Sequence, residues 1–214
     1  MGNRAVITTD NKSYEVNRSS EIGVYLHWNG SRDSVEAFLK YCKLKGYRPP
    51  ETDGYGWARL CQVIGNFFGG GLSIGIGKCC ELDCDNWDNG TYIIKNWEVI
   101  DRKYVHGVDP ADGYDITDML IEIDSRQPVD EQLGKEFFLA EEIPVSEVKM
   151  GDTVFFYDEI YNRYEKHTVM GICYDDISWI KKKGTPYVDK YEHVDGYGWN
   201  ANNYIRTETI RVCR

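Results

Sequence analysis

The order in which two hydrophobic periodicities appear along the chain constrains its fold more than any other feature. Short runs rich in β-branched and aromatic residues, typical of strands, come first at 5–8 and 22–28. Two stretches with helical spacing follow at 33–46 and 55–68, and the pattern returns to strands from residue 84 onward. Because strands and helices do not alternate regularly, the sequence predicts an α+β protein rather than a doubly wound sheet.

The first helix is predicted from its ends as well as its apolar stripe. Asp33 is placed to cap the helix, Glu36 follows three residues later as in a capping box, and Gly46 is placed to end it. The second helix is predicted to end at 69–71, where three glycines follow one another. Residues 72–76 then predict a buried strand.

Turn signals divide the rest of the chain. Asp88-Asn89-Gly90 predicts a hairpin turn that leads into strands at 92–94 and 97–105. Residues 117–125 are compatible with a helix or a strand, because so short an apolar run does not distinguish them. A short helix is predicted at 130–139.

The last third predicts a small β module, with strands at 153–157, 168–174 and 205–212. We therefore expect an α+β domain over residues 1–127, made of mixed strands, two helices and β-hairpins. A smaller β-rich, barrel-like module is expected over residues 128–214.

The charge balance limits the partners of the chain. It has 35 acidic and 25 basic residues and a formal net charge of -10. Affinity for nucleic acid comes from clustered Lys and Arg, so direct binding of duplex nucleic acid is not expected, whereas imitation of nucleic acid is allowed. The acidic residues are spread through predicted loops at 83–88, 109–118 and 175–176, which favours a patterned folded surface.

Location is predicted from the N-terminal residues, the apolar stretches and the cysteines. The first ten residues lack the apolar segment of a secretory signal. The longest uncharged stretch, 60–77, is interrupted by polar residues and glycines, so no membrane association is expected. Seven cysteines, an odd number, favour free thiols in a reducing compartment. The expected location is the cytoplasm of a bacterial host.

No cofactor or metal is expected. The glycine-rich stretch at 69–78 has Leu72 and Cys79 where a phosphate-binding loop needs Gly and Ser or Thr. The cysteines and aspartates that follow lack the spacing of zinc or calcium ligands, and Trp87 stands where a third oxygen ligand for calcium belongs. These cysteines and aspartates are Cys79, Cys80, Asp83, Cys84, Asp85 and Asp88.

Two polar and aromatic clusters predict a binding site. The first cluster, at 27–33, lies between a strand and the N-terminus of a helix, where a polar or anionic ligand is favoured. The second cluster, at 53–59, lies at the start of the next helix and offers aromatic contact surface. We consider a nucleotide pocket around His27, Arg32 and Arg59, with the alternative that Trp28 and Trp57 are core residues. The pentapeptide 53–57 recurs at 195–199. The candidate binding residues are His27, Trp28, Asn29, Arg32, Asp33, Asp53, Tyr55, Trp57 and Arg59.

A catalytic alternative pairs Cys84 with His167 as a thiolate and an imidazolium. Residues 149–156 followed by 167–172 resemble the second half of the NlpC-type cell-wall cysteine peptidases, in which a Gly-Asp strand precedes the strand with the catalytic His. In that family the nucleophile begins a helix, whereas Cys84 is followed by acidic, hairpin-like sequence that raises a thiol pKa.

The first seventy residues also resemble a group of proteins from phages and mobile elements of Gram-positive bacteria that has no established activity. The likeness rests on 3–7, 25–30, 33–39, 55–59 and 62–68. Accessory proteins of this kind act on host defence systems, so the resemblance implies a cytoplasmic, acidic inhibitor of a defence nuclease complex. We expect a basic host protein as the partner, with a small anionic nucleotide as the variant.

Overall fold

The computed structural model describes residues 2–9, 21–71, 73–106, 114–158, 163–172, 186–188 and 208–214. The chain divides into two compact units, residues 1–132 and 133–214, and each combines helical and strand segments as an α+β chain does. The sequence had suggested a boundary five residues earlier, after Gln127. Within the described ranges no helix is both long and apolar enough to cross a membrane.

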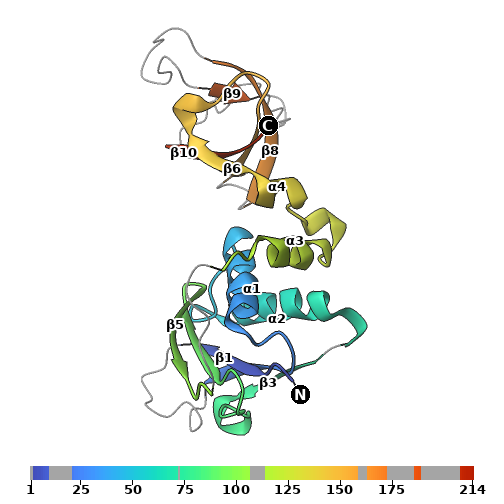
Figure 1. The fold of residues 1–214 in the computed structure, drawn as a ribbon, viewed down its shortest axis with the longest axis vertical. Coiled ribbons are helices and arrows are strands. Elements are labelled where there is room, and N and C mark those ends of the chain that lie inside the picture. The colour runs from blue at the N-terminus through green and yellow to red at the C-terminus, as the bar shows by residue number, and fades with distance from the viewer. Residues whose placement is uncertain are drawn as a thin grey trace. The chain divides into compact units, whose positions relative to one another are not determined.

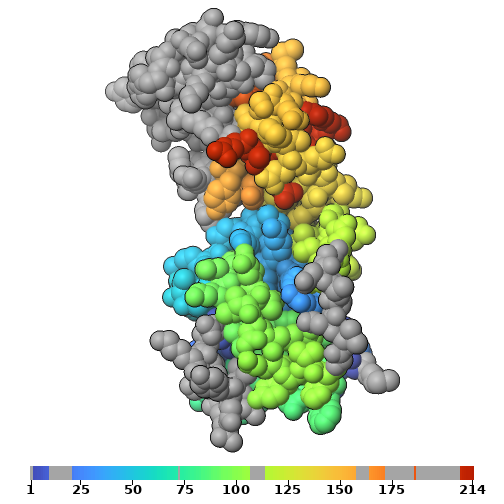
Figure 2. Space-filling model, turned by 60° about the vertical axis from the view of Figure 1, so that its left-hand side comes forward, coloured from blue at the N-terminus to red at the C-terminus, as the bar shows by residue number. Residues whose placement is uncertain are grey.

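A five-stranded mixed sheet forms the centre of the N-terminal unit, in the order β3-β2-β1-β4-β5. The central strand β1 pairs antiparallel with β2 and parallel with β4, and each of its five residues is buried. The edge strand β5 lies on the surface of this unit, in green in Figure 2. The strands are β1 (Ala5–Thr9), β2 (Ile22–Leu26), β3 (Ile74–Lys78), β4 (Thr91–Lys95) and β5 (Glu98–Lys103).

Three helices pack together on one side of this sheet: α1 (Arg32–Leu44), α2 (Gly54–Phe68) and α3 (Thr117–Ser125) (Figure 1). The stretch 117–125, which the sequence left open, is therefore helical. A buried hydrogen bond ties α1 to α3, since the Tyr41 hydroxyl donates to Asp124 Oδ1 at 2.8 Å. Asp124 is 2% exposed, so this bond is made away from water.

The opposite face of the sheet is covered by the irregular segment 79–90, which follows β3 (Figure 1). Cys79 and Cys84 of this segment pack on Val6 of β1, with Leu82 beside them. Gly23 makes room for the segment, because a Cβ atom at that position would lie 2.8 Å from Leu82 Cδ1. Both faces of β1 are thus covered.

The predicted capping box of the first helix is wrong. The N-cap of α1 is Ser31, and Asp33 lies within the first turn, where its carboxylate accepts from the Ser34 amide at 2.7 Å. Glu36 pairs with Arg32 at 2.8 Å instead of reaching back to the N-cap. An aspartate within the first turn interacts with the same amide groups as a cap, which explains why the sequence places the N-cap two residues too late.

The predicted hairpin turn at Asn89-Gly90 is also wrong. The turn between β4 and β5 is Asn96-Trp97, with φ angles of 50° and 63°. A tryptophan rarely adopts this conformation, but here its side chain is 4% exposed and its Nε1 donates to the Tyr47 carbonyl at 2.7 Å. The strands predicted at 92–94 and 97–105 leave space for this turn, and tertiary packing lets a tryptophan adopt the conformation that the turn requires.

The strand expected at 72–76 is displaced and is not buried. It is β3, at the edge of the sheet, and its Ile76 is 60% exposed. Gly75 and Gly77 alternate with the isoleucines, so one face of this strand carries no side chains. The apolar run predicts a buried strand because composition does not distinguish an edge strand of a sheet from a central one.

The C-terminal unit contains a five-stranded antiparallel sheet in the order β6-β10-β7-β8-β9. Its core combines aliphatic residues, among them Val154, Val169 and Val212, with the buried rings of Phe137 and Phe155. Among the described strands, β6 and β9 stand at the two ends of the order, so a closed barrel is not observed. The elements are α4 (Lys135–Leu139), β6 (Glu141–Pro144), β7 (Thr153–Asp158), β8 (Arg163–Ile172), β9 (Pro186–Val188) and β10 (Thr209–Cys213).

The helix expected at 130–139 is interrupted. A 3-10 turn at Val129–Glu131 is followed by Gly134, which has a φ of 87°, and α4 begins only after it. Glycine is the residue that adopts this conformation without a steric penalty, and it ends helical geometry there.

Gly90→Ala is expected to destabilise the N-terminal unit by about 2–4 kcal/mol, the sum of a left-handed backbone and a collision. A Cβ atom at Gly90, whose φ is 69°, would lie 2.1 Å from the Lys103 carbonyl oxygen. Urea unfolding measures the loss. Gly69→Ala is the control for backbone strain alone, because its φ is also positive, at 58°, but its surroundings are open. Its ψ of -132° lies outside the left-handed helical region, so a loss of about 1–3 kcal/mol is expected, with no collision to add. Equal losses in the two variants would contradict the packing role of Gly90.

The stability of the N-terminal unit is expected to fall as pH rises above about 10. Burial, with the hydrogen bond to Asp124, raises the pKa of Tyr41 far above its ordinary value. The unfolded chain then loses a proton that the folded chain keeps, so the free energy of unfolding decreases by up to about 1.4 kcal/mol per pH unit for this group. Urea titrations between pH 8 and 11 should give a shallower decline for Tyr41→Phe, and an unchanged slope would exclude Tyr41 as the cause.

Candidate functional site

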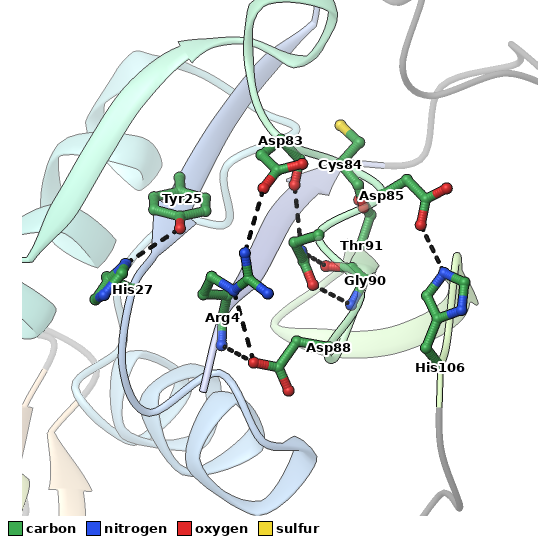
Figure 3. A network of polar contacts seen from close by, with 11 residues as sticks. Arg4, Tyr25, His27, Asp83, Cys84, Asp85, Asp88, Gly90, Thr91 and His106 are labelled. Carbon is green, nitrogen blue, oxygen red and sulfur yellow. Dashed lines mark hydrogen bonds and ion pairs between the residues drawn. The ribbon is translucent and has the colours of Figure 1, made fainter. Parts of the chain in front are cut away.

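The first predicted cluster lies in the turn between β2 and α1. His27 and Trp28 are exposed and contact each other edge to face, with ring centroids 5.1 Å apart. His27 Nδ1 lies 3.3 Å from the Tyr25 hydroxyl (Figure 3). Asn29 has a φ of 54°, and the turn is fixed to the chain before β1 by the Gly30 amide, which donates to the Asn3 carbonyl at 2.8 Å.

The charges of this cluster do not favour an anion. The Arg32 guanidinium pairs with Glu36 at 2.8 Å, so its charge is already balanced within α1. Asp33 places a carboxylate in the first turn, where the amide groups of the helix would otherwise attract an anionic ligand. The cluster is an exposed aromatic turn rather than a cradle for phosphate.

The second predicted cluster stabilises the start of α2. Asp53 is its N-cap, accepting from the Tyr55 amide at 2.9 Å, and it pairs with Arg48 at 2.7 Å. Trp57 is 9% exposed and belongs to the core, as the alternative interpretation had it. Arg59 donates to Gln62 and lies over the Tyr47 ring at 5.1 Å.

The two predicted clusters lie at opposite ends of the N-terminal unit. His27 is bound through its carbonyl to Asn3, just before β1 begins. Arg59 rests on Tyr47, which receives the hydrogen bond from Trp97 in the β4–β5 turn, beyond the end of β4. The 13 residues of α1 span roughly 20 Å between these ends. A pocket that combines His27, Arg32 and Arg59 is therefore excluded.

A polar network that the sequence did not predict lies beside the first cluster (Figure 3). The Arg4 guanidinium lies between two carboxylates of the segment 79–90, 3.8 Å from Asp83 and 3.7 Å from Asp88. Its backbone amide also donates to Asp88 at 3.0 Å. Burial raises the pKa of Tyr25, and the nearby Arg4 charge partly opposes that rise. These contacts fix the acidic segment to the start of β1.

At the other side of the same segment, His106 Nε2 lies 2.6 Å from Asp85 Oδ1 (Figure 3). The His106 ring also stacks on Trp87, with ring centroids 4.5 Å apart and an interplanar angle of 20°. From the sequence, Trp87 indicates only that a third oxygen ligand for calcium is missing, and no pattern marks His106 as a functional residue. The one available signal was a large aromatic residue within an acidic, turn-rich stretch.

Cys84 lacks the surroundings of a nucleophile. It is 2% exposed, and its thiol donates to the Cys79 carbonyl oxygen at 3.3 Å. The neighbouring Cys79 thiol and burial raise the pKa of Cys84, which is the opposite of what a reactive thiolate needs. Cys84 begins no helix, so no helix N-terminus lowers its pKa.

His167 belongs to the C-terminal unit, on β8, whereas Cys84 belongs to the N-terminal unit. Its ring stacks on Phe156 at 4.8 Å, and its Nε2 lies 3.2 Å from Glu165. Both partners of the imidazole therefore belong to the same sheet as His167 itself. The repeated pentapeptide at 195–199 lies outside the described residues.

No metal centre is formed in the part of the chain that the structure describes, where no group of three or more His, Cys, Asp or Glu side chains is placed to hold an ion. A cleft of about 240 Å³ in the N-terminal unit contains none of the predicted site residues. It is lined by Glu36, Lys40, Trp97, Glu98, Val99 and Ile116.

Comparisons with protein-family models, with curated proteins and with solved structures gave no significant match. These comparisons therefore indicate no function for this chain.

Alkylation of the folded protein by iodoacetamide at pH 7.5 is expected to modify Cys80 at least ~10-fold faster than Cys84. Cys80 is exposed, whereas Cys84 is buried and holds its proton. Peptide mass spectrometry over time measures both rates, and a sample in 6 M guanidinium provides the control in which the rates converge. Fast modification of Cys84 in the folded protein would restore the catalytic interpretation.

Proposed function

We propose that this chain is a binding protein without catalytic function, whose acidic N-terminal unit docks on a basic protein surface. The observation that carries the proposal is the segment 79–90, which presents carboxylates and an exposed tryptophan on a fixed backbone. Glu81, Asp83 and Asp85 have side chains that are 62, 54 and 45% exposed.

The ion pairs within this segment leave room for a partner. Lys78 lies 3.8 Å from Glu81, and Arg4 lies at similar distances from Asp83 and Asp88. Long pairs between groups that are at least partly exposed contribute little, so Glu81 and Asp83 stay available to an external cation. Asp85 differs, because one of its oxygens already lies 2.6 Å from His106 Nε2. The net charge of -10 adds long-range attraction to a basic surface.

In its most specific form, the proposal is that the partner is a nuclease complex of a host defence system. An acidic surface would occupy the basic groove that such a nuclease uses for DNA or RNA. The chain would then be a cytoplasmic inhibitor carried by a phage or mobile element. This form rests on the resemblance of the first seventy residues to proteins of such elements.

Two alternatives have weaker support. A pocket for a small anionic nucleotide has to overcome the Arg32–Glu36 pair and the Asp33 carboxylate. A cysteine hydrolase has to activate Cys84, whose thiol is buried and whose pKa is raised.

The proposal predicts salt-sensitive capture of basic proteins. The tagged chain, incubated with a nuclease-treated bacterial lysate, should retain basic nucleic-acid-binding proteins at about 50 mM salt and release them at about 500 mM, because screening shortens the range of charge attraction. Added duplex DNA or RNA should displace the same proteins. Quantitative mass spectrometry compares the conditions. Retention that changes with neither salt nor nucleic acid would contradict the hypothesis that the acidic surface imitates nucleic acid.

A matched pair of triple variants locates the effect. Glu81→Gln, Asp83→Asn and Asp85→Asn together should weaken binding of a captured partner by at least ~10-fold. Neutralising three exposed carboxylates elsewhere in the same unit, at Asp118, Glu122 and Asp130, should change it by less than about 3-fold. Equal losses would assign the binding to net charge rather than to the segment 79–90.

A further inference from the structure

Trp87 is the most unusual surface residue of the N-terminal unit. Its side chain is 76% exposed although it is a large aromatic group. One face of the indole is covered by the His106 ring, which lies nearly parallel at a centroid distance of 4.5 Å. With that face stacked and most of the side chain exposed, the other face is open to solvent.

Hydrogen bonds from His106 to its neighbours in the N-terminal unit hold the stack in place. The His106 imidazole is fixed through Nε2 to Asp85, at 2.6 Å, and its backbone amide donates to the Asp88 carbonyl at 3.3 Å. Both aspartates flank Trp87 in the sequence. The indole therefore has a defined support rather than free rotation into solvent.

The backbone beneath Trp87 is equally fixed. Asn86, which is 1% exposed, accepts from the Gly90 amide at 3.0 Å and donates to the Gly90 and Asp83 carbonyls. The Val6 amide donates to the Gly90 carbonyl at 2.9 Å, which joins this segment to the central strand. An exposed aromatic side chain on a rigid base loses little conformational entropy on binding, which is typical of interface hot spots.

The segment around Trp87 is acidic, which favours a cation as the partner group. Asp83 and Asp85 precede Trp87 and are about half exposed, with Asp83 beside Arg4 and Asp85 bound to His106 on the covered side of the indole. A flat aromatic face in an acidic segment suits a guanidinium, which stacks on an indole. A lysine ammonium makes the ionic contact but lacks the planar stacking.

We infer that the Trp87–His106 stack is the docking point for an arginine side chain of a basic protein partner. The inference rests on the proposed function and deepens it, because it names the group of the partner that this surface recognises. Trp87 supplies the stacking face, and the acidic segment 79–90 supplies the attraction that brings a cation to it.

The test uses the full chain and three capped nonapeptides, of arginine, lysine or glutamate, at about 100 mM salt. Titration calorimetry should give binding of the arginine peptide that is at least ~5-fold tighter than that of the lysine peptide, and no binding of the glutamate peptide. In ¹⁵N-labelled protein, the indole N–H signal of Trp87, assigned from its loss in Trp87→Phe, should shift with the arginine peptide.

Trp87→Ala should weaken arginine-peptide binding at least ~10-fold, and Trp87→Phe should weaken it less, because a smaller ring still stacks. Val129→Ala, which alters another highly exposed apolar side chain of this unit, should leave binding unchanged. Urea unfolding establishes that all three variants keep the fold.

Three results would overturn the inference: equal binding by Trp87→Ala and the parent chain, an unmoved Trp87 indole signal, or equal affinity for the arginine and lysine peptides. If Trp87→Ala binds normally while the triple neutralisation of Glu81, Asp83 and Asp85 abolishes binding, the inference of an arginine docking point at Trp87 is wrong. The proposed function of the acidic surface is then still supported. If neither basic peptide binds the parent chain, the proposed function itself fails.

Discussion

The structure of the N-terminal unit depends on the burial of β1 from both sides. Ala5–Thr9 pairs with β2 on one side and β4 on the other, and all five residues are buried. Of its two threonines, the fully buried Thr8 is satisfied, donating to the Ile22 carbonyl and accepting from the Cys79 thiol. A strand in this position needs helices on one face and a second cover on the other, and the segment 79–90 is that cover.

Much of the fold is encoded locally and was predictable. The apolar stripe of α1 and the glycines at 46 and 69 predict two helices close to their observed bounds, because burial and left-handed helix ends leave a sequence signature. The place of the β4–β5 turn follows from the predicted strands, but its conformation was not predictable. Asn96-Trp97 adopts its conformation only because Tyr47, fifty residues earlier, holds the indole.

The candidate site was less predictable than the fold, because its residues meet through long-range pairing. Arg4 and Asp88 are 84 positions apart, and His106 reaches Asp85 only after two strands have intervened. The residues chosen from local sequence, such as Asp53 and Trp57, serve mainly to cap and pack α2. The proposed binding depends on exposure, and the sequence does not reveal that Trp87 is exposed while Trp57 and Trp97 are buried.

The parallel pairing of β1 with β4 has a consequence for synthesis. β1 is made more than eighty residues before the partner that completes its environment, so a growing chain holds an apolar strand without one neighbour and without its cover. At about 5–20 residues per second this interval lasts several seconds. The N-terminal unit is therefore a candidate for chaperone protection on the ribosome, because the segment 79–90 covers the second face of β1 only after α1 and α2 have been made.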